Sequence, residues 1–94
     1  MWGNRQYQNI AGAATTVVAA KTGRLWAIVI NKAVLSGVVT VYDNTAASGT
    51  KIATITQPAS VLQSQNSLDY AGLVYTIGLT VVTSAADDIT VIYS

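Results

Sequence analysis

The chain has 94 residues with 10% charged side chains and a formal net charge of +1. An ordinary soluble domain has about 25% charged residues, and this length is enough for one domain. Because cysteine and histidine are absent, disulfides, a thiol nucleophile, an imidazole base and the usual zinc or haem ligands are excluded. The near-neutral charge also lacks the cationic surface that nucleic acid binding requires.

Valine, isoleucine and threonine supply 32 of the 94 residues, a composition that favours strands over helices. Residues 1–13 mix Trp2 and Tyr7 with amides and glycine. We expect them to form an N-terminal arm or a short edge strand before a single domain over residues 14–94. Neither a signal peptide nor a membrane-spanning helix is predicted, because no apolar stretch has the required length and flanks.

The first half of the domain contains the most apolar run of the chain. Residues 15–20 predict a strand, which Lys21-Thr22-Gly23 ends. The run at 25–30 contains six apolar residues without alternation, which indicates a strand buried on both faces. One face would contact the core and the other a second sheet or a neighbouring subunit. The candidate subunit-interface residues are therefore Trp26, Ile28 and Ile30.

Two hairpins are expected further along the chain. Residues 38–43 and 51–56 flank a polar loop of about six residues, which predicts a β-hairpin. Residues 79–83 and 89–93 predict a second hairpin across residues 84–88.

Between these hairpins, residues 57–68 are polar and rich in amides, and they predict a long surface connection with room for a short strand at 61–62. Pro58 ends the preceding strand because it has no amide hydrogen to donate. Residues 69–76 predict another strand. Together the segments give seven or eight short antiparallel strands, which indicates an all-β fold, a small jelly-roll-like β-sandwich.

Residues that could carry chemistry are few. The pair Asp87-Asp88 could contribute calcium ligands, but a solvated hairpin loop explains it better because no further acidic residue lies nearby. A glycine-flanked serine elbow and a glycine-rich phosphate loop are absent from the sequence. We therefore expect a protein that is not an enzyme and needs no metal or cofactor.

The aromatic residues allow two interpretations. Two tryptophans and five tyrosines could form the sugar-stacking platform of a carbohydrate-binding module, or they could belong to the core and to protein interfaces. A small domain without disulfides or metal commonly needs oligomerisation for stability. We therefore expect a homo-oligomer, with Trp2, Arg5 and Tyr7 as contacts to a partner.

Three segments carry a resemblance to a known family when taken in this order: RLWAIVINKA (24–33), VYDNTAASGTKIATI (41–55), and GLTVVTS with DDITVIYS (78–84 and 87–94). Over residues 20–94 the chain resembles small virion structural proteins of tailed bacteriophages. The resemblance implies a capsid decoration, or cement, protein: a β-sandwich, often a trimer, made in the host cytoplasm and bound to the major capsid protein on the head. It also allows a head-fibre or tail-associated subunit, and the family has no catalytic residues.

Overall fold

The computed structural model describes residues 5–57 and 66–94, which form eight strands and no helix. The expected short strand at 61–62 lies outside the described residues. The strands are β1 (Gln6–Ala11), β2 (Ala14–Ala19), β3 (Gly23–Lys32), β4 (Val38–Asp43), β5 (Thr50–Thr56), β6 (Asn66–Tyr75), β7 (Leu79–Thr83) and β8 (Asp88–Tyr93).

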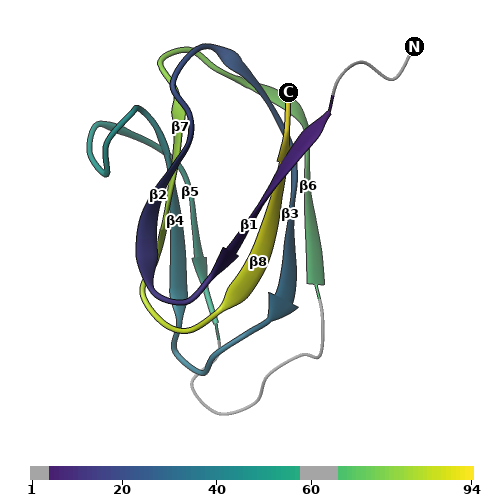
Figure 1. Ribbon diagram of the computed structural model, residues 1–94, viewed down its shortest axis with the longest axis vertical. Helices are drawn as coiled ribbons and strands as arrows, with labels where there is room; N and C mark the ends of the chain where they lie inside the picture. Colours follow the sequence, from purple (N-terminus) through teal and green to yellow (C-terminus); the bar gives the residue numbers. More distant parts are fainter. Residues whose placement is uncertain (1–4, 58–65) are drawn as a thin grey trace.

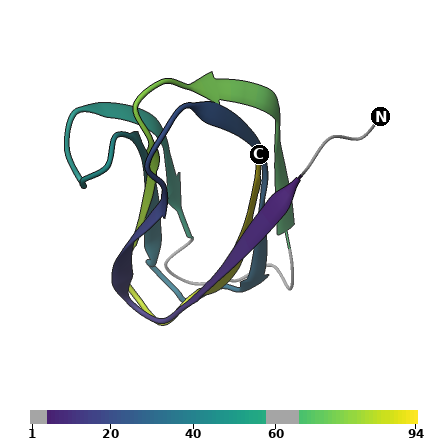
Figure 2. The ribbon, with the colours of Figure 1, turned by 45° about the horizontal axis from the view of Figure 1, so that its top comes forward.

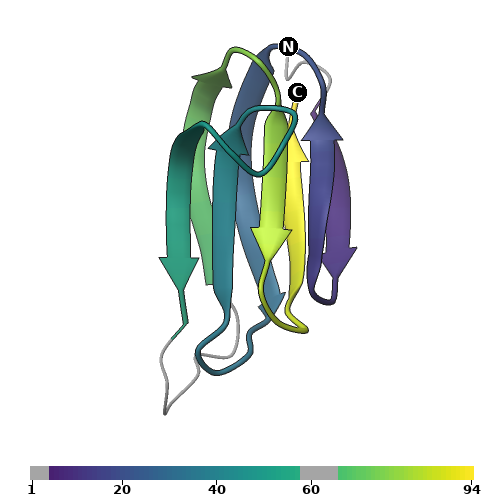
Figure 3. The same cartoon turned by 90° about the vertical axis from the view of Figure 1, so that its left-hand side faces the viewer.

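The strands form two four-stranded antiparallel sheets that pack face to face (Figure 1). Sheet A has the order β1-β8-β3-β6, and sheet B has the order β2-β7-β4-β5. Figure 2 shows the two layers obliquely, tilted by 45° from Figure 1, and Figure 3 shows the strands of sheet B in front of sheet A. Every strand is followed by one in the opposite sheet, except β4, which is followed by its neighbour β5. This winding of eight strands is that of a jelly roll, so the predicted fold is confirmed.

The first predicted hairpin is confirmed, whereas the second is wrong. β4 pairs with β5 from Val38 and Thr56 to Asp43 and Thr50. In contrast, β7 pairs with β2 and β4 in sheet B, while β8 pairs with β1 and β3 in sheet A. The connection between β7 and β8 therefore crosses from one sheet to the other. Two apolar strands joined by a short polar loop allow either arrangement, because the pattern records which face is buried but not which strand is the partner.

The N-terminal segment belongs in part to the sandwich. β1 pairs with β8 along its whole length, from Gln6 opposite Tyr93 to Ala11 opposite Asp88. Of the expected arm over residues 1–13, residues 6–11 are thus an edge strand of sheet A, and only Ile10 among them is buried. A glycine is needed at the turn into β2, because Gly12 has a φ of 98°.

Two of the three residues in the apolar run of β3 that were predicted at a subunit interface lie in the core, whereas the interface role of the third, Trp26, stays a prediction. Ile28 and Ile30 are 0% and 2% exposed and belong to the core between the sheets, so their assignment to a subunit interface is wrong. The pairing of β3 with both neighbours shifts between Leu25 and Ala27: over this stretch β3 has one residue more than β8, at Trp26, whereas β6 has two residues more than β3. Trp26 and Ala27 are both half-buried, and this bulge interrupts the alternation that a regular strand would show.

The core consists of one cluster of aliphatic side chains and a single tyrosine, drawn from both sheets. Its members are Ile10, Leu25, Ile28, Ile30, Val39, Val41, Tyr75, Leu79, Val81, Ile89 and Val91. Strands β3, β4, β7 and β8 supply most of them, so the central strands of both sheets hold the sandwich together.

Asp87, in the connection between β7 and β8, is a buried carboxylate at the end of the sandwich. It is fully buried, and within the described residues no hydrogen bond of good geometry reaches either carboxylate oxygen, although the backbone of Val34 lies close enough to act on its pKa. A Cβ added to Gly37 would lie 2.9 Å from Asp87 Oδ1, which shows how tightly the chain packs around this group. Burial raises the pKa of Asp87 above its ordinary value of 3.8, and the backbone of Val34 opposes the rise only in part.

Replacing Asp87 by asparagine is expected to stabilise the fold at neutral pH by about 1 kcal/mol, because a buried amide costs less than a buried charge. A raised folded-state pKa means that protonation favours folding. The native protein should therefore gain stability as the pH falls through the folded-state pKa of Asp87, and Asp87→Asn should lose this gain. Urea unfolding at a series of pH values measures both effects. Lower stability of Asp87→Asn at neutral pH would contradict the prediction.

Candidate functional site

The outer face of sheet A carries the most distinctive side-chain arrangement among the described residues. Trp26 lies there at the bulge of β3, and its indole Nε1 donates a hydrogen bond of 3.0 Å to Ser94 Oγ. The guanidinium carbon of Arg5 lies 3.9 Å from the centre of the indole ring. This stacking is a cation–π contact, which ties the start of β1 to β3 across β8.

Strand β6 bends around the same ring. Leu25 pairs with Leu73 whereas Ala27 pairs with Asp69, so β6 contains two more residues than β3 over this stretch. The extra length is accommodated by Ala71 and Gly72, which have positive φ values of 54° and 77°.

Gly72 lets the backbone of β6 approach the indole closely. A Cβ added to Gly72 would lie 2.9 Å from Trp26 Cη2, so a side chain would displace the ring. Arg24 Nη1 donates a hydrogen bond of 3.1 Å to the carbonyl oxygen of Gly72 and holds the bulge in place.

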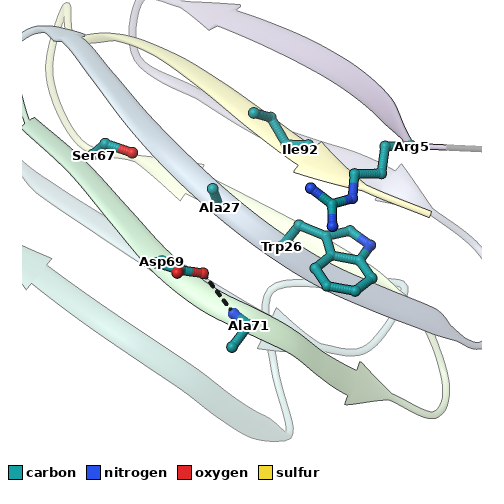
Figure 4. Close-up of a pocket in the computed structure, with 7 residues that line it drawn as sticks. All are labelled: Arg5, Trp26, Ala27, Ser67, Asp69, Ala71 and Ile92. Carbon is teal, nitrogen blue, oxygen red and sulfur yellow. Dashed lines mark hydrogen bonds between the residues drawn. The ribbon is translucent and has the colours of Figure 1, made fainter. Parts of the chain in front are cut away.

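These features surround a pocket of about 360 Å³ that opens on the outer face of sheet A (Figure 4). Figure 4 shows Arg5 above the indole, with Asp69 and Ala71 on the neighbouring strand β6. Asp69 Oδ1 accepts a hydrogen bond of 2.8 Å from the backbone amide of Ala71. The pocket is lined by Arg5, Trp26, Ala27, Ser67, Asp69, Ala71 and Ile92.

The opposite end of this face carries a hydrogen-bonded polar cluster. Asp88 Oδ1 accepts hydrogen bonds from Nδ2 of Asn9 at 2.7 Å and from Nδ2 of Asn31 at 3.2 Å. Asn31 Nδ2 also donates to Thr90 Oγ1 at 3.0 Å. Hydrogen bonds from Asn9 and then Asn31, together with the charge of Lys32, lower the pKa of Asp88. This cluster ties β1, β8 and β3 together at the surface.

The structure brings together two residues to which the sequence assigned different roles. Arg5 was predicted to contact a partner and Trp26 a neighbouring subunit, yet they stack on each other. Tyr7 lies on β1 and is 76% exposed, as a partner contact would require. Trp2 lies outside the described residues, so its predicted contact stays a prediction.

Sequence reasoning missed Ser67 and Asp69 as pocket residues. The available signal was Gly72, because a glycine inside a predicted strand often marks a bulge or a close approach of the backbone. That signal shows where a strand is irregular, but it does not show which side chain of another strand lies against it.

The adjacent carboxylates of Asp87 and Asp88 lie in different environments. Asp87 is buried at the end of the sandwich, whereas Asp88 belongs to the polar cluster on sheet A. Within residues 5–57 and 66–94, no three histidine, cysteine, aspartate or glutamate side chains gather in a way that could hold a metal ion.

Comparison with known proteins identifies no relative. No protein-family model, curated protein or solved structure matches the chain. In the part of the chain that the structure describes, no helix is long and apolar enough to cross a membrane.

Proposed function

We propose that the protein is a non-enzymatic structural subunit of a tailed-phage virion, a decoration protein that binds the major capsid protein on the outside of the head and stabilises it. The observation that carries this proposal is a set of three exposed apolar side chains at one edge of sheet A. The ordered resemblance of residues 24–33, 41–55 and 78–94 to small phage virion proteins supports the identity of the partner.

This set, named here the apolar edge, consists of Leu73, Val74 and Ile77, which are 42%, 50% and 57% exposed. Leu73 and Val74 lie on β6, which is an edge strand of sheet A, and Ile77 follows it. An edge strand presents unpaired backbone groups, and soluble proteins usually protect such an edge with charges, prolines or a covering segment. An edge with three exposed aliphatic side chains favours cover by another protein.

A second exposed surface lies at the other edge of sheet A, where β1 presents Tyr7. A closed ring of three identical subunits needs two different contact surfaces on each copy. In the proposed trimer, the β1 edge of one copy contacts the apolar edge of the next. Three copies that bind the shell together raise one another's effective concentration, so weak individual contacts suffice.

The test compares two valines of nearly equal exposure on edge strands of different sheets. Val74 on β6 is 50% exposed, and Val17 on β2 is 48% exposed. We expect the native protein to have the mass of a trimer by light scattering and to sediment with phage heads that lack it. Val74→Asp should lower both the mass and the bound fraction, because a charge at the apolar edge opposes burial. The matched control Val17→Asp should leave both unchanged, with circular dichroism confirming that each variant is folded.

A native protein that stays monomeric at high concentration and does not sediment with heads would refute the proposal. Equal effects of Val74→Asp and Val17→Asp would refute the role of the apolar edge. Binding to purified tails or fibres in place of heads would assign the protein to the head-fibre or tail-associated class.

A further inference from the structure

Apart from Arg5, which the sequence also assigns to a partner contact, the residues around the pocket beside Trp26 have no part in the proposed contacts with the capsid, and the pocket has the size and chemistry of a small-molecule site. We propose that this pocket binds one ring of a neutral saccharide. Its volume of about 360 Å³ falls within the range of about 300–1,000 Å³ that is typical of ligand pockets.

The lining offers the two kinds of contact that a sugar ring uses. A pyranose has hydroxyl groups that both donate and accept hydrogen bonds, and C–H groups that pack against an aromatic side chain. Asp69 supplies a hydrogen-bond acceptor, Arg5 supplies donors, and the hydroxyl of Ser67 supplies both. Trp26, Ala27 and Ile92 supply the apolar surface of the pocket.

The charges of the lining favour a neutral ligand. Among the described residues that line it, Asp69 and Arg5 are the only ionised side chains, with opposite signs, so their charges nearly cancel. A phosphate or another anion would be repelled by Asp69, and an ammonium group would be repelled by Arg5. Hydroxyl groups can use both side chains at once, because the carboxylate accepts from them and the guanidinium donates to them.

The backbone of the lining residue Ala71 and its neighbour is held in an uncommon conformation. Ala71 has a φ of 54°, although alanine rarely adopts positive φ, and the neighbouring Gly72 has a φ of 77°. Asp69 Oδ1 supports this conformation through its hydrogen bond to the amide of Ala71. Backbone strain of about 1–3 kcal/mol commonly lies at binding sites, where it positions side chains for a ligand.

The aromatic wall of the pocket is also fixed before any ligand arrives. Trp26 is held by Ser94 at its indole nitrogen, by Arg5 over its ring and by the close backbone of Gly72. A side chain held in this way loses little conformational freedom on binding, and this lowers the cost of recognising a small ligand.

The experiment is a titration of the ¹⁵N-labelled full chain with neutral monosaccharides and their short oligomers, followed by NMR. Glucose, galactose, mannose and N-acetylglucosamine are the probes, and glucuronic acid and glucosamine are the charged counterparts. We expect at least one neutral sugar to give saturable shifts at the Trp26 indole N–H and at the amides of residues 69–71. The charged counterpart of the same sugar should bind more weakly.

Variants then separate the pocket from the rest of the face. Asp69→Asn should weaken binding about tenfold or more, since a charged acceptor of the sugar hydroxyls is replaced by a weaker neutral one. Ser67→Ala should weaken it less and provides a second variant should Asp69→Asn fail to fold. The matched control is Asp88→Asn, the same change on the same face outside the pocket, and it should leave the affinity unchanged.

The proposal is overturned if no neutral sugar gives saturable shifts at these positions, or if Asp69→Asn and Asp88→Asn bind equally well. The result does not depend on the proposed virion function. Loss of head binding with sugar binding retained removes only the decoration role, and the reverse outcome removes only the saccharide site.

Discussion

Replacement of Ile28 by alanine is expected to lower the free energy of unfolding by about 3 kcal/mol. Ile28 is completely buried between the two sheets, and truncation removes apolar contacts and leaves a cavity in a closely packed core. Urea unfolding followed by tryptophan fluorescence measures the change.

The matched control is Val29→Ala, one residue further along β3. Val29 is only half-buried, so its truncation should cost about 1 kcal/mol or less. Light scattering on the folded variants measures their oligomeric mass, so an effect on assembly can be distinguished from an effect on stability. An Ile28→Ala protein with native stability but a lower oligomeric mass would restore Ile28 as an interface residue and contradict its place in the core.

Replacement of Asp43 by alanine is expected to destabilise the fold by about 2 kcal/mol, because one carboxylate holds the whole turn that joins β6 to β7. Asp43 Oδ1 accepts hydrogen bonds from the backbone amides of Thr76 at 3.0 Å and Ile77 at 2.9 Å, and Oδ2 accepts from Thr76 Oγ1 at 3.1 Å. Hydrogen bonds to a charged group contribute more than neutral ones, and solvent at this partly exposed site reduces the total. Thermal and urea unfolding measure the loss. Asp43→Asn keeps one acceptor oxygen and should lose less.

Asp43 also predicts an acid-dependent loss of stability, with the sign opposite to that of Asp87. The amides of Ile77 and Thr76 lower the pKa of Asp43 below its ordinary value of 3.8. The stabilisation that the ionised carboxylate of Asp43 provides is therefore fully present at pH values above its unfolded-state pKa. This stabilisation disappears as the pH falls through its folded-state pKa. The difference in free energy of unfolding between the native protein and Asp43→Asn should shrink as the pH falls over that range. A difference that stays constant at all pH values would contradict the role of the ionised carboxylate.

The local structure that sequence predicts well is the structure that depends only on neighbouring residues. Residues 38–56 form the predicted hairpin because β-branched strands flank a loop that Asn44 and Gly49 shape locally: Asn44 Nδ2 donates to the carbonyl oxygen of Ser48 at 2.8 Å, and Gly49 has a φ of 85°. The similar pattern at 79–93 folds differently, because its strands pair with β2, β4, β1 and β3. Which partners a strand chooses is decided by contacts far apart in the chain.

The candidate site depended on such distant contacts to a greater degree. Trp26 and Asp69 lie on β3 and β6, and Arg5 directly precedes β1; they line one pocket where a bulge in β3 lies opposite a longer one in β6. No spacing in the sequence records a register shift between strands. The apolar run at 25–30 has no alternation, so it does not show which face meets the core, and the inserted residue at Trp26 exchanges the two faces for the residues that follow, Ile28 and Ile30 included.

By itself, the sequence determined the all-β fold class, the sandwich and the exclusion of thiol and imidazole chemistry, since these follow from residue composition and local patterning. Only the tertiary structure decided the jelly-roll winding, the burial of Asp87 and the meeting of Arg5, Trp26 and Asp69 at one pocket. The physical reason is that strand pairing and register are set by the packing of the two sheets against each other, which no short segment of the chain contains.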